Sequence, residues 1–171
     1  CLRVPSCDFA VIPDVIDGDE KANDDLLAEW PFPRWRGAPV WHLHESLARL
    51  QTLATGWPRV CIGSSGEFAQ IRTPHWWRRM AEAMRVVCDD HGCPQTRLHG
   101  LRMLDPQVFT QFPFASVDST NIGINVGKDQ NWRGSYQPAT KEARAVVMRN
   151  RIEAHNAPAR WDGMPHQPEQ G

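Results

Sequence analysis

The sequence predicts an α/β fold in which parallel strands and helices alternate. Short apolar runs alternate with longer amphipathic segments about five times along the 171 residues, and Gly, Pro and Asp mark most of the boundaries. Strands that are apolar throughout are typical of a parallel sheet with helices on its faces. Five β/α units match an open doubly wound sheet. They also match the C-terminal part of a (β/α)8 TIM barrel, because a full barrel takes about 250 residues.

Each expected element has a local signal. The expected strands are residues 9–12, 40–43, 60–62, 96–104 and 114–118. The expected helices are residues 18–30, 45–54, 73–87, 105–112 and 141–155. Asp19 is the expected cap of the first helix. The third helix has the clearest signal, because Thr73 and Pro74 mark its start and apolar residues then recur at helical spacing.

The chain is expected to form one domain, residues 1–157, followed by a flexible tail, residues 158–171. The tail is rich in Pro, Gly and polar residues, a composition typical of frayed chain ends. The sequence begins without Met, in the middle of a pattern, and five strands cannot close an eight-stranded barrel. We therefore expect a preceding N-terminal segment or a partner chain to complete the barrel.

Composition indicates a globular protein without a strong overall charge. Lys and Arg total 19 and Asp and Glu total 20, so the formal net charge of −1 predicts no bulk attraction to a polyanion. No apolar run reaches the roughly 18 residues of a membrane span and no signal peptide is visible, so we expect no membrane partner. The five cysteines form no CxxC motif, and we expect a reducing, cytoplasmic setting.

Polar side chains follow all five expected strands. They are Asp14 after the first strand, His42, His44 and Glu45 after the second, residues 63–67 after the third, His99, Gly100 and Arg102 in the fourth, and Asp118 and Ser119 after the fifth. In both architectures, ligands bind at the carboxyl ends of the strands. Each residue alone has a structural explanation, such as a helix cap, a tight turn or an Asx-turn. Their gathering on one rim favours a binding or catalytic site.

Three chemistries fit these residues. Asp118 can act as a nucleophile on an electrophilic carbon while other rim residues hold the substrate. Alternatively, a metal-dependent (β/α)8 hydrolase would use His42, His44, His99 and Asp118 as ligands, because residues two apart on a strand share a face. A Ser-His-Asp hydrolase ranks last, because the run CIGSSGE misses the G-x-S-x-G spacing by one residue.

The motifs VIPDVID, VWHLHES, CIGSSGE, LHGLRML and FASVDSTN, in this order, resemble the C-terminal half of the tRNA-guanine transglycosylase superfamily. The resemblance covers roughly residues 8–125 and is closest to the branch, encoded by bacteria and phages, that inserts 7-deazaguanines into DNA. It implies a (β/α)8 barrel. It also implies a base-exchange glycosyltransferase, related to queuosine chemistry, that replaces guanine in nucleic acid by a 7-deazaguanine without a cofactor. We therefore expect an enzyme.

The resemblance also implies roles for individual residues. Asp118 matches the nucleophile of the family, and Asp14 matches the acid that reads the edge of guanine. The other implied substrate-binding positions are His44, Gly63, Ser64, Ser65 and Gly100. In the implied mechanism, the carboxylate of Asp118 attacks C1′ of the target nucleotide, and the incoming 7-deazaguanine then displaces it.

One departure from the family concerns the nucleic acid. The tRNA enzymes carry a zinc site of three Cys and one His after the nucleophile, whereas no Cys follows Cys93 here. DNA is therefore favoured over tRNA as the partner. The basic residues expected to contact phosphates are Arg72, Arg78, Arg79, Lys128 and Arg133. The metal-dependent hydrolase and a non-catalytic remnant or binding module are the alternatives.

Overall fold

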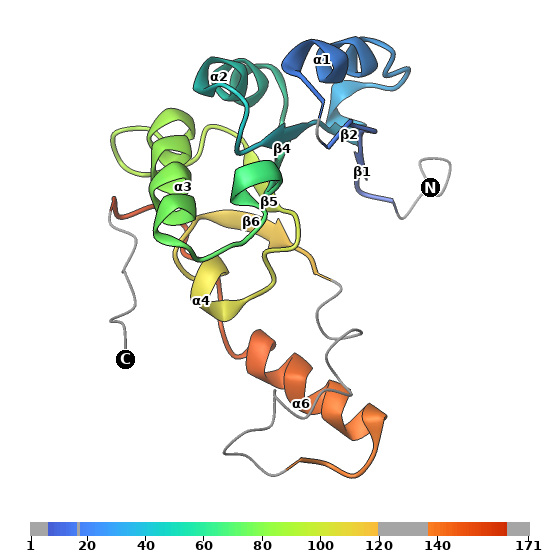
Figure 1. The fold of residues 1–171 in the computed structure, drawn as a ribbon, viewed down its shortest axis with the longest axis vertical. Coiled ribbons are helices and arrows are strands. Elements are labelled where there is room, and N and C mark those ends of the chain that lie inside the picture. Colours follow the sequence, from blue (N-terminus) through green and yellow to red (C-terminus); the bar gives the residue numbers. More distant parts are fainter. Residues whose placement is uncertain (1–6, 17, 120–136, 164–171) are drawn as a thin grey trace.

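The computed structural model describes residues 7–16, 18–119 and 137–163 (Figure 1). Its strands are β1 (Ala10–Val11), β2 (Gly37–Ala38), β3 (Val40–His42), β4 (Arg59–Gly63), β5 (Arg97–Gly100) and β6 (Phe114–Val117). Its helices are α1 (Glu20–Ala28), α2 (Leu47–Gly56), α3 (Pro74–Val87), α4 (Pro106–Phe109) and α6 (Lys141–Glu153), with short 3-10 turns η1 (Arg34–Arg36) and η2 (Gly66–Phe68). Among the described helices, none has the length and apolar character to cross a membrane.

All strand pairs are parallel, and the strands lie side by side in the order of the sequence. β1 pairs with β2, and β3, β4, β5 and β6 follow one another in a second sheet. Only Pro39 separates β2 from β3, and its carbonyl accepts a hydrogen bond from the backbone N–H of Cys61 at 2.8 Å. The predicted α/β class is therefore confirmed. Among the described residues, the order within each sheet contains no reversal, which a doubly wound sheet requires, and it matches consecutive β/α units.

The sheet buries apolar side chains on both faces. On one face, Trp41, Ile62 and Leu98 belong to the main core, to which α2 and α3 also contribute. On the other face, Val40 and Cys61 form a smaller cluster, against which half-buried residues pack. Successive strand residues point to opposite faces, so a strand that is apolar throughout becomes buried on both sides.

Helix α3 forms where the sequence predicts it. The Thr73 hydroxyl accepts a hydrogen bond from the backbone N–H of Trp76 at 3.1 Å, and Pro74 occupies the first turn. Pro is favourable there because the first N–H groups of a helix have no partner within it. The buried side of α3 carries Trp77, Met80 and other apolar residues, and α3 lies beside α2 (Figure 1).

A buried carboxylate joins three segments beneath the strand ends. Glu45 is 2% exposed and accepts hydrogen bonds from the His42 backbone N–H at 2.9 Å, from the Asn23 amide at 3.0 Å and from the Arg49 guanidinium at 2.7 Å. Asn23 also accepts from the Val15 N–H at 2.7 Å. The network therefore ties the loop after β1 to α1, to the end of β3 and to α2.

Part of the C-terminal region lies against α3. The backbone N–H of Trp161 donates to the carbonyl of Gly92 at 2.8 Å, and Arg85 of α3 lies 5.9 Å from the centre of the Trp161 ring. A side chain at Gly92 would meet the Trp161 carbonyl at 2.0 Å, and the φ of Gly92 is +75°. Glycine is therefore required at this contact. The expected tail thus includes a packed tryptophan, and residues 164–171 lie outside the described part.

We predict that Glu45→Ala lowers the free energy of unfolding by about 3 kcal/mol, because it leaves the Arg49 guanidinium buried without its partner. Urea denaturation measures this change. The matched control is Glu82→Ala, whose side chain is 47% exposed in its ion pair with Arg79; this change should cost less than about 1 kcal/mol. Equal losses in the two variants would contradict a structural role for the Glu45 network.

Candidate functional site

One cavity lies at the carboxyl ends of the strands and has a volume of about 390 Å³. Its lining residues are Asp14, Ile16, His42, Gly63, Ser64, Leu101, Arg102, Asp118 and Ser119. This volume lies within the usual range for small-molecule sites, and the mixture of apolar walls with a few convergent polar groups is typical of them.

The cavity brings together residues that follow strands of the two sheets. Asp14 follows β1 and Asp118 follows β6, and these strands lie at the two ends of the strand order. Asp14 contacts His42 at the end of β3, and through this contact the loop after β1 reaches the cavity that Asp118 also lines.

The Asp14 carboxylate is held by a buried histidine. Its Oδ2 lies 2.6 Å from Nε2 of His42, which is 3% exposed. The position of this imidazole depends on Gly63, the register partner of His42 in β4. A Cβ on Gly63 would come within 2.9 Å of His42 Nδ1. Gly63 therefore provides the space that the ring occupies.

Asp118 is held differently, mainly by backbone groups. Its Oδ1 accepts a hydrogen bond from the backbone N–H of Arg102 at 2.7 Å, and its own N–H donates to the Gly100 carbonyl at 3.1 Å. Oδ2 lies 3.4 Å from Nε2 of His99, and the side chain is 55% exposed. One oxygen is thus anchored, while the other has only a loose contact and faces an open cavity.

Two local features support this arrangement around Asp118. Arg102 has a φ of +60°, a left-handed conformation that is unfavourable for a residue with a side chain. This conformation accompanies the hydrogen bond from the Arg102 N–H to Asp118. His99 is oriented by Ser116, whose hydroxyl lies 2.8 Å from its Nδ1, and by the ring of Phe9 at 5.6 Å.

Cys61 lies in β4, on the face of the sheet that leads to the cavity. Burial, together with the nearby carboxylates of Asp118 and Asp14 and against the opposing effect of Arg59, raises the pKa of its thiol to about 12. The thiol therefore stays protonated at physiological pH and acts as a small apolar residue.

The predicted site residues separate into those that line the cavity and those that support it. Asp14, Gly63, Ser64 and Asp118 line it. His44 is exposed, and its Nδ1 lies 3.1 Å from the Ser65 hydroxyl. Ser65 is 5% exposed, and Gly100 is buried under the Asp118 backbone. A ligand in the cavity would therefore not touch His44, Ser65 or Gly100 directly. These three residues would act on it through the residues that they contact.

The alternative metal site is wrong for the described residues. Among them, no group of three or more His, Cys, Asp or Glu side chains could hold a metal ion. The rings of His42 and His44 are stacked with their centres 5.5 Å apart, but both direct their Nδ1 atoms to Ser65. His99 instead contacts Asp118. The four expected ligands therefore form two separate pairs, His42 with His44 around Ser65 and His99 beside Asp118.

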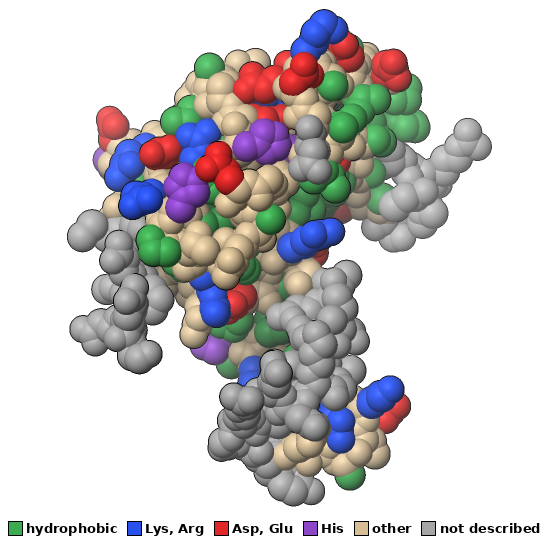
Figure 2. All heavy atoms as spheres, viewed as in Figure 1, with side chains coloured by type: hydrophobic (Ala, Val, Ile, Leu, Met, Phe, Trp, Pro, Cys, Tyr) green, Lys and Arg blue, Asp and Glu red, His purple; other side chains and the backbone are tan. Residues whose placement is uncertain are grey.

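The predicted phosphate-binding arginines differ in their availability. Arg79 donates to the carbonyls of Leu43 and Glu45 at 2.7 and 2.5 Å, so its guanidinium is committed to the fold. Arg72 contacts Asp105 and Gln107, and Arg78 is exposed on α3. Lys128 and Arg133 lie outside the described residues. On the face that Figure 2 shows, acidic and basic side chains are interspersed.

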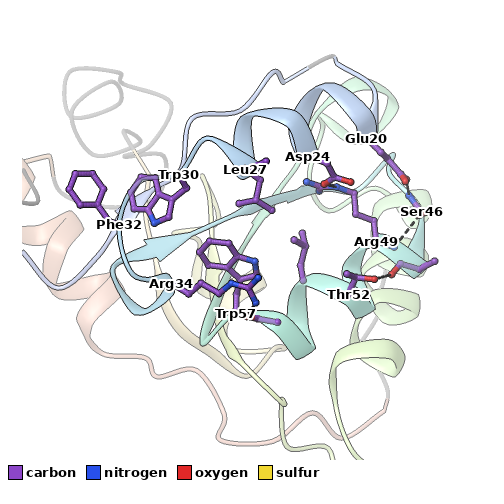
Figure 3. Close-up of a pocket in the computed structure, with 14 residues that line it drawn as sticks. Glu20, Asp24, Leu27, Trp30, Phe32, Arg34, Ser46, Arg49, Thr52 and Trp57 are labelled. Carbon is purple, nitrogen blue, oxygen red and sulfur yellow. Dashed lines mark hydrogen bonds and ion pairs between the residues drawn. The ribbon is translucent and has the colours of Figure 1, made fainter.

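A larger hollow, of about 720 Å³, lies between α1 and α2 (Figure 3). Trp30 and Trp57 contribute apolar surface to its wall, and Asp24 and Arg49 form an ion pair there at 2.9 Å. None of the predicted site residues that the structure describes lines it. Ligands of parallel α/β folds bind at the carboxyl ends of strands, so the smaller cavity is the candidate site.

Sequence reasoning missed three contributions to this cavity. The Arg102 backbone N–H holds Asp118, Ile16 and Leu101 supply apolar walls, and His42 supports Asp14 rather than a metal. The position of His42 opposite Gly63 on the next strand is the signal that indicates a buried, supporting role for this histidine. Reading that signal requires the strand register, which the residues of a single strand do not provide.

We predict that Gly63→Ala lowers the free energy of unfolding by about 1–3 kcal/mol, because the new methyl group overlaps the His42 ring. The matched control is Gly56→Ala at the end of α2, where a Cβ would have only Arg34 Nη1 nearby, at 3.5 Å. This control should leave stability unchanged or slightly raised. Urea denaturation measures the free energy of unfolding of both variants. An unchanged value for Gly63→Ala would show that the His42 ring can move to make room for the methyl group.

We predict that the Cys61 thiol resists alkylation by iodoacetamide at pH 8 in the folded chain. Since its pKa is about 12, only about one thiol in 10⁴ is ionised at that pH, and the thiolate is the reactive form. The half-buried Cys93 serves as the internal control. Peptide mass spectrometry measures labelling with and without urea. Labelling of Cys61 as fast as Cys93 in the folded state would contradict its burial.

The cavity and its two differently held carboxylates are the structural basis for assigning a function. Comparison of the chain with protein-family models, curated proteins and solved structures found no match. A function is therefore argued from the residues of this chain and from the family that its motifs resemble.

Proposed function

We propose that this chain is a base-exchange glycosyltransferase that replaces guanine in nucleic acid by a 7-deazaguanine, with Asp118 as the nucleophile. The observation that carries the proposal is the cavity shared by Asp14 and Asp118, which lie more than 100 positions apart in the sequence. The reaction requires two carboxylates at one base-sized site: one attacks the sugar and the other recognises the base.

The environment of Asp118 suits nucleophilic attack. The backbone N–H of Arg102 stabilises negative charge on Oδ1 and fixes the carboxylate, and Oδ2 is the oxygen left to react. Oδ2 would bond to C1′ as the bond from C1′ to N9 of guanine breaks, passing through an oxocarbenium-like transition state. The incoming base would then displace the carboxylate from the opposite face, so the β configuration at C1′ is retained.

Asp14 suits recognition of a purine edge. A carboxylate accepts hydrogen bonds only, and guanine presents two neighbouring donors, N1–H and the exocyclic amine. His42 contacts Oδ2 of Asp14, which leaves Oδ1 and the remaining lone pairs for the base. Ile16 and Leu101 provide apolar surface beside it. Adenine lacks this donor pair and would leave Oδ1 of Asp14 without the donors that guanine offers.

Access to the cavity requires a base outside its helical stack, which costs a few kcal/mol. Arg102 lines the cavity. Arg72 and Arg78 are exposed, and they follow the cavity residue Ser64 in the sequence. These side chains are the candidates for phosphate contacts that hold the flipped nucleotide. DNA is proposed as the acceptor, because the cysteines of the tRNA enzymes have no counterpart after Cys93. The proposed chemistry needs no cofactor.

We predict that the full chain exchanges labelled guanine into DNA and forms a denaturant-stable adduct with a DNA oligonucleotide when no incoming base is supplied. Asp118→Asn should lower exchange by at least about 10⁴-fold and abolish the adduct, because the amide cannot replace the carboxylate as nucleophile. Denaturing gels measure the adduct, and tRNA and free guanosine serve as competing acceptors.

The matched control is Asp25→Asn on the exposed surface of α1, which should exchange like the unmodified chain. An adduct that persists in Asp118→Asn would show that another residue is the nucleophile. Binding of DNA without exchange or adduct would instead favour the non-catalytic binding module. Preference for tRNA or guanosine would overturn DNA as the acceptor while leaving the chemistry in place.

A further inference from the structure

We infer that Asp14, His42, Ser65 and His44 form a proton relay that connects the cavity with solvent. The inference rests on the proposed function, because base exchange is the reaction that would use the relay. The four side chains form a continuous chain of contacts. Asp14 Oδ2 lies 2.6 Å from His42 Nε2, His42 Nδ1 lies 3.1 Å from Ser65 Oγ, and Ser65 Oγ lies 3.1 Å from His44 Nδ1.

The burial of these residues matches a path from the cavity to the surface. Asp14 lines the cavity, with its side chain 22% exposed. His42 and Ser65 are 3% and 5% exposed, so they lie inside the protein. His44 is exposed. The two ends of the relay thus reach the cavity and bulk water, while the two middle members are buried from bulk water.

The hydrogen bonds have one consistent direction when Asp14 is a carboxylate. Asp14 then only accepts, so Nε2 of His42 carries the hydrogen. In neutral His42, Nδ1 is an acceptor, and Ser65 must donate to it. The remaining lone pairs of the Ser65 oxygen accept from His44, whose hydrogen must therefore be on Nδ1. Every donor in the chain points toward the cavity.

Shifting each of these hydrogens by one bond gives a second consistent state. His42 Nε2 gives its hydrogen to Asp14, Ser65 gives its hydrogen to His42 Nδ1, and His44 Nδ1 gives its hydrogen to Ser65. His44 takes one proton from water at Nε2 and so changes from one neutral tautomer to the other. In total, one proton moves from solvent to Asp14, and His42, Ser65 and His44 remain neutral.

Base exchange needs such a movement of one proton in each half-reaction. When the C1′–N9 bond breaks, its electron pair stays on guanine, which would be an anion facing the Asp14 carboxylate. The relay delivers a proton to Oδ2 of Asp14, which neutralises the carboxylate while Oδ1 still accepts from the base. N9 of guanine takes this proton from Asp14 through water as the base leaves. The incoming base loses its N9 proton as its bond to C1′ forms, and an equal proton returns through the relay.

Two other arrangements are disfavoured by the same geometry. Ser65, His42 and Asp14 have the order of a hydrolase triad, but Ser65 is buried, does not line the cavity and already contacts both histidines. The chain from Ser116 through His99 to Asp118 contains a 3.4 Å separation between Nε2 and Oδ2, which is too long for a strong hydrogen bond. The relay through His42 has no such gap.

The first test uses the free chain and needs no activity. Side-chain ¹⁵N NMR distinguishes the two neutral tautomers of each histidine, and single His→Gln variants assign the signals. The relay requires the hydrogen on Nε2 in His42 and on Nδ1 in His44, and Ser65→Ala should abolish the Nδ1–H preference of His44. A His44 that keeps its hydrogen on Nε2 would overturn the relay, whatever the chain catalyses.

The second test uses adduct formation with a DNA oligonucleotide. His44→Ala should slow adduct formation about 100-fold, as expected for loss of assisted proton transfer, without weakening DNA binding, and added imidazole should restore the rate. His75→Ala, another exposed histidine with its own carboxylate partner, is the control and should behave like the unmodified chain. Unchanged adduct formation in His44→Ala, or a slow variant that imidazole does not rescue, would overturn the relay.

The two tests separate the relay from the proposed function. Failure of the proposed function appears as the absence of adduct and exchange in the unmodified chain itself. The predicted histidine tautomers would in that case support the hydrogen-bonded relay as a feature of the cavity. Normal exchange with the opposite His44 tautomer would overturn the relay and leave the proposed function standing.

Discussion

The buried carboxylate of Glu45 is the interaction on which the candidate site depends. It receives the backbone N–H of His42, the amide of Asn23 and the guanidinium of Arg49, and is 2% exposed. A buried charge is tolerated only when its hydrogen-bonding capacity is filled. Filling it draws α1, α2 and the end of β3 together. The loop after β1, bonded to Asn23, then carries Asp14 to the His42 imidazole.

The two carboxylates of the cavity are held by opposite means, and this difference matches their proposed roles. Asp118 is fixed by a backbone N–H that a left-handed Arg102 directs at it, and its side chain stays 55% exposed. Asp14 is fixed by an imidazole that belongs to a longer chain of side chains. A backbone donor holds a charge in place without titrating, whereas an imidazole can both give and take a proton. Nucleophilic attack needs the first property and proton movement the second.

The elements of the fold could be predicted from the sequence because their signals are local. Asp19 and Thr73 cap helices as expected, accepting from the N–H groups of Ala22 and Trp76. The apolar strands are buried on both faces, as a parallel sheet requires. The fate of individual polar residues could not be predicted in this way. Arg79 was expected to bind phosphate, but its guanidinium donates to backbone carbonyls that come from another part of the chain.

The sequence by itself determined the β/α alternation, the helix starts and the gathering of polar residues at the strand ends. Only the tertiary structure decided which of those residues meet. Strand register places His42 over Gly63, and the packing of the two sheets brings Asp14 and Asp118 to one cavity. The tertiary structure also directs His42 and His44 to Ser65 instead of to a metal. The physical reason is that caps and periodicity act within a few residues, whereas contacts between strands depend on how the whole sheet packs.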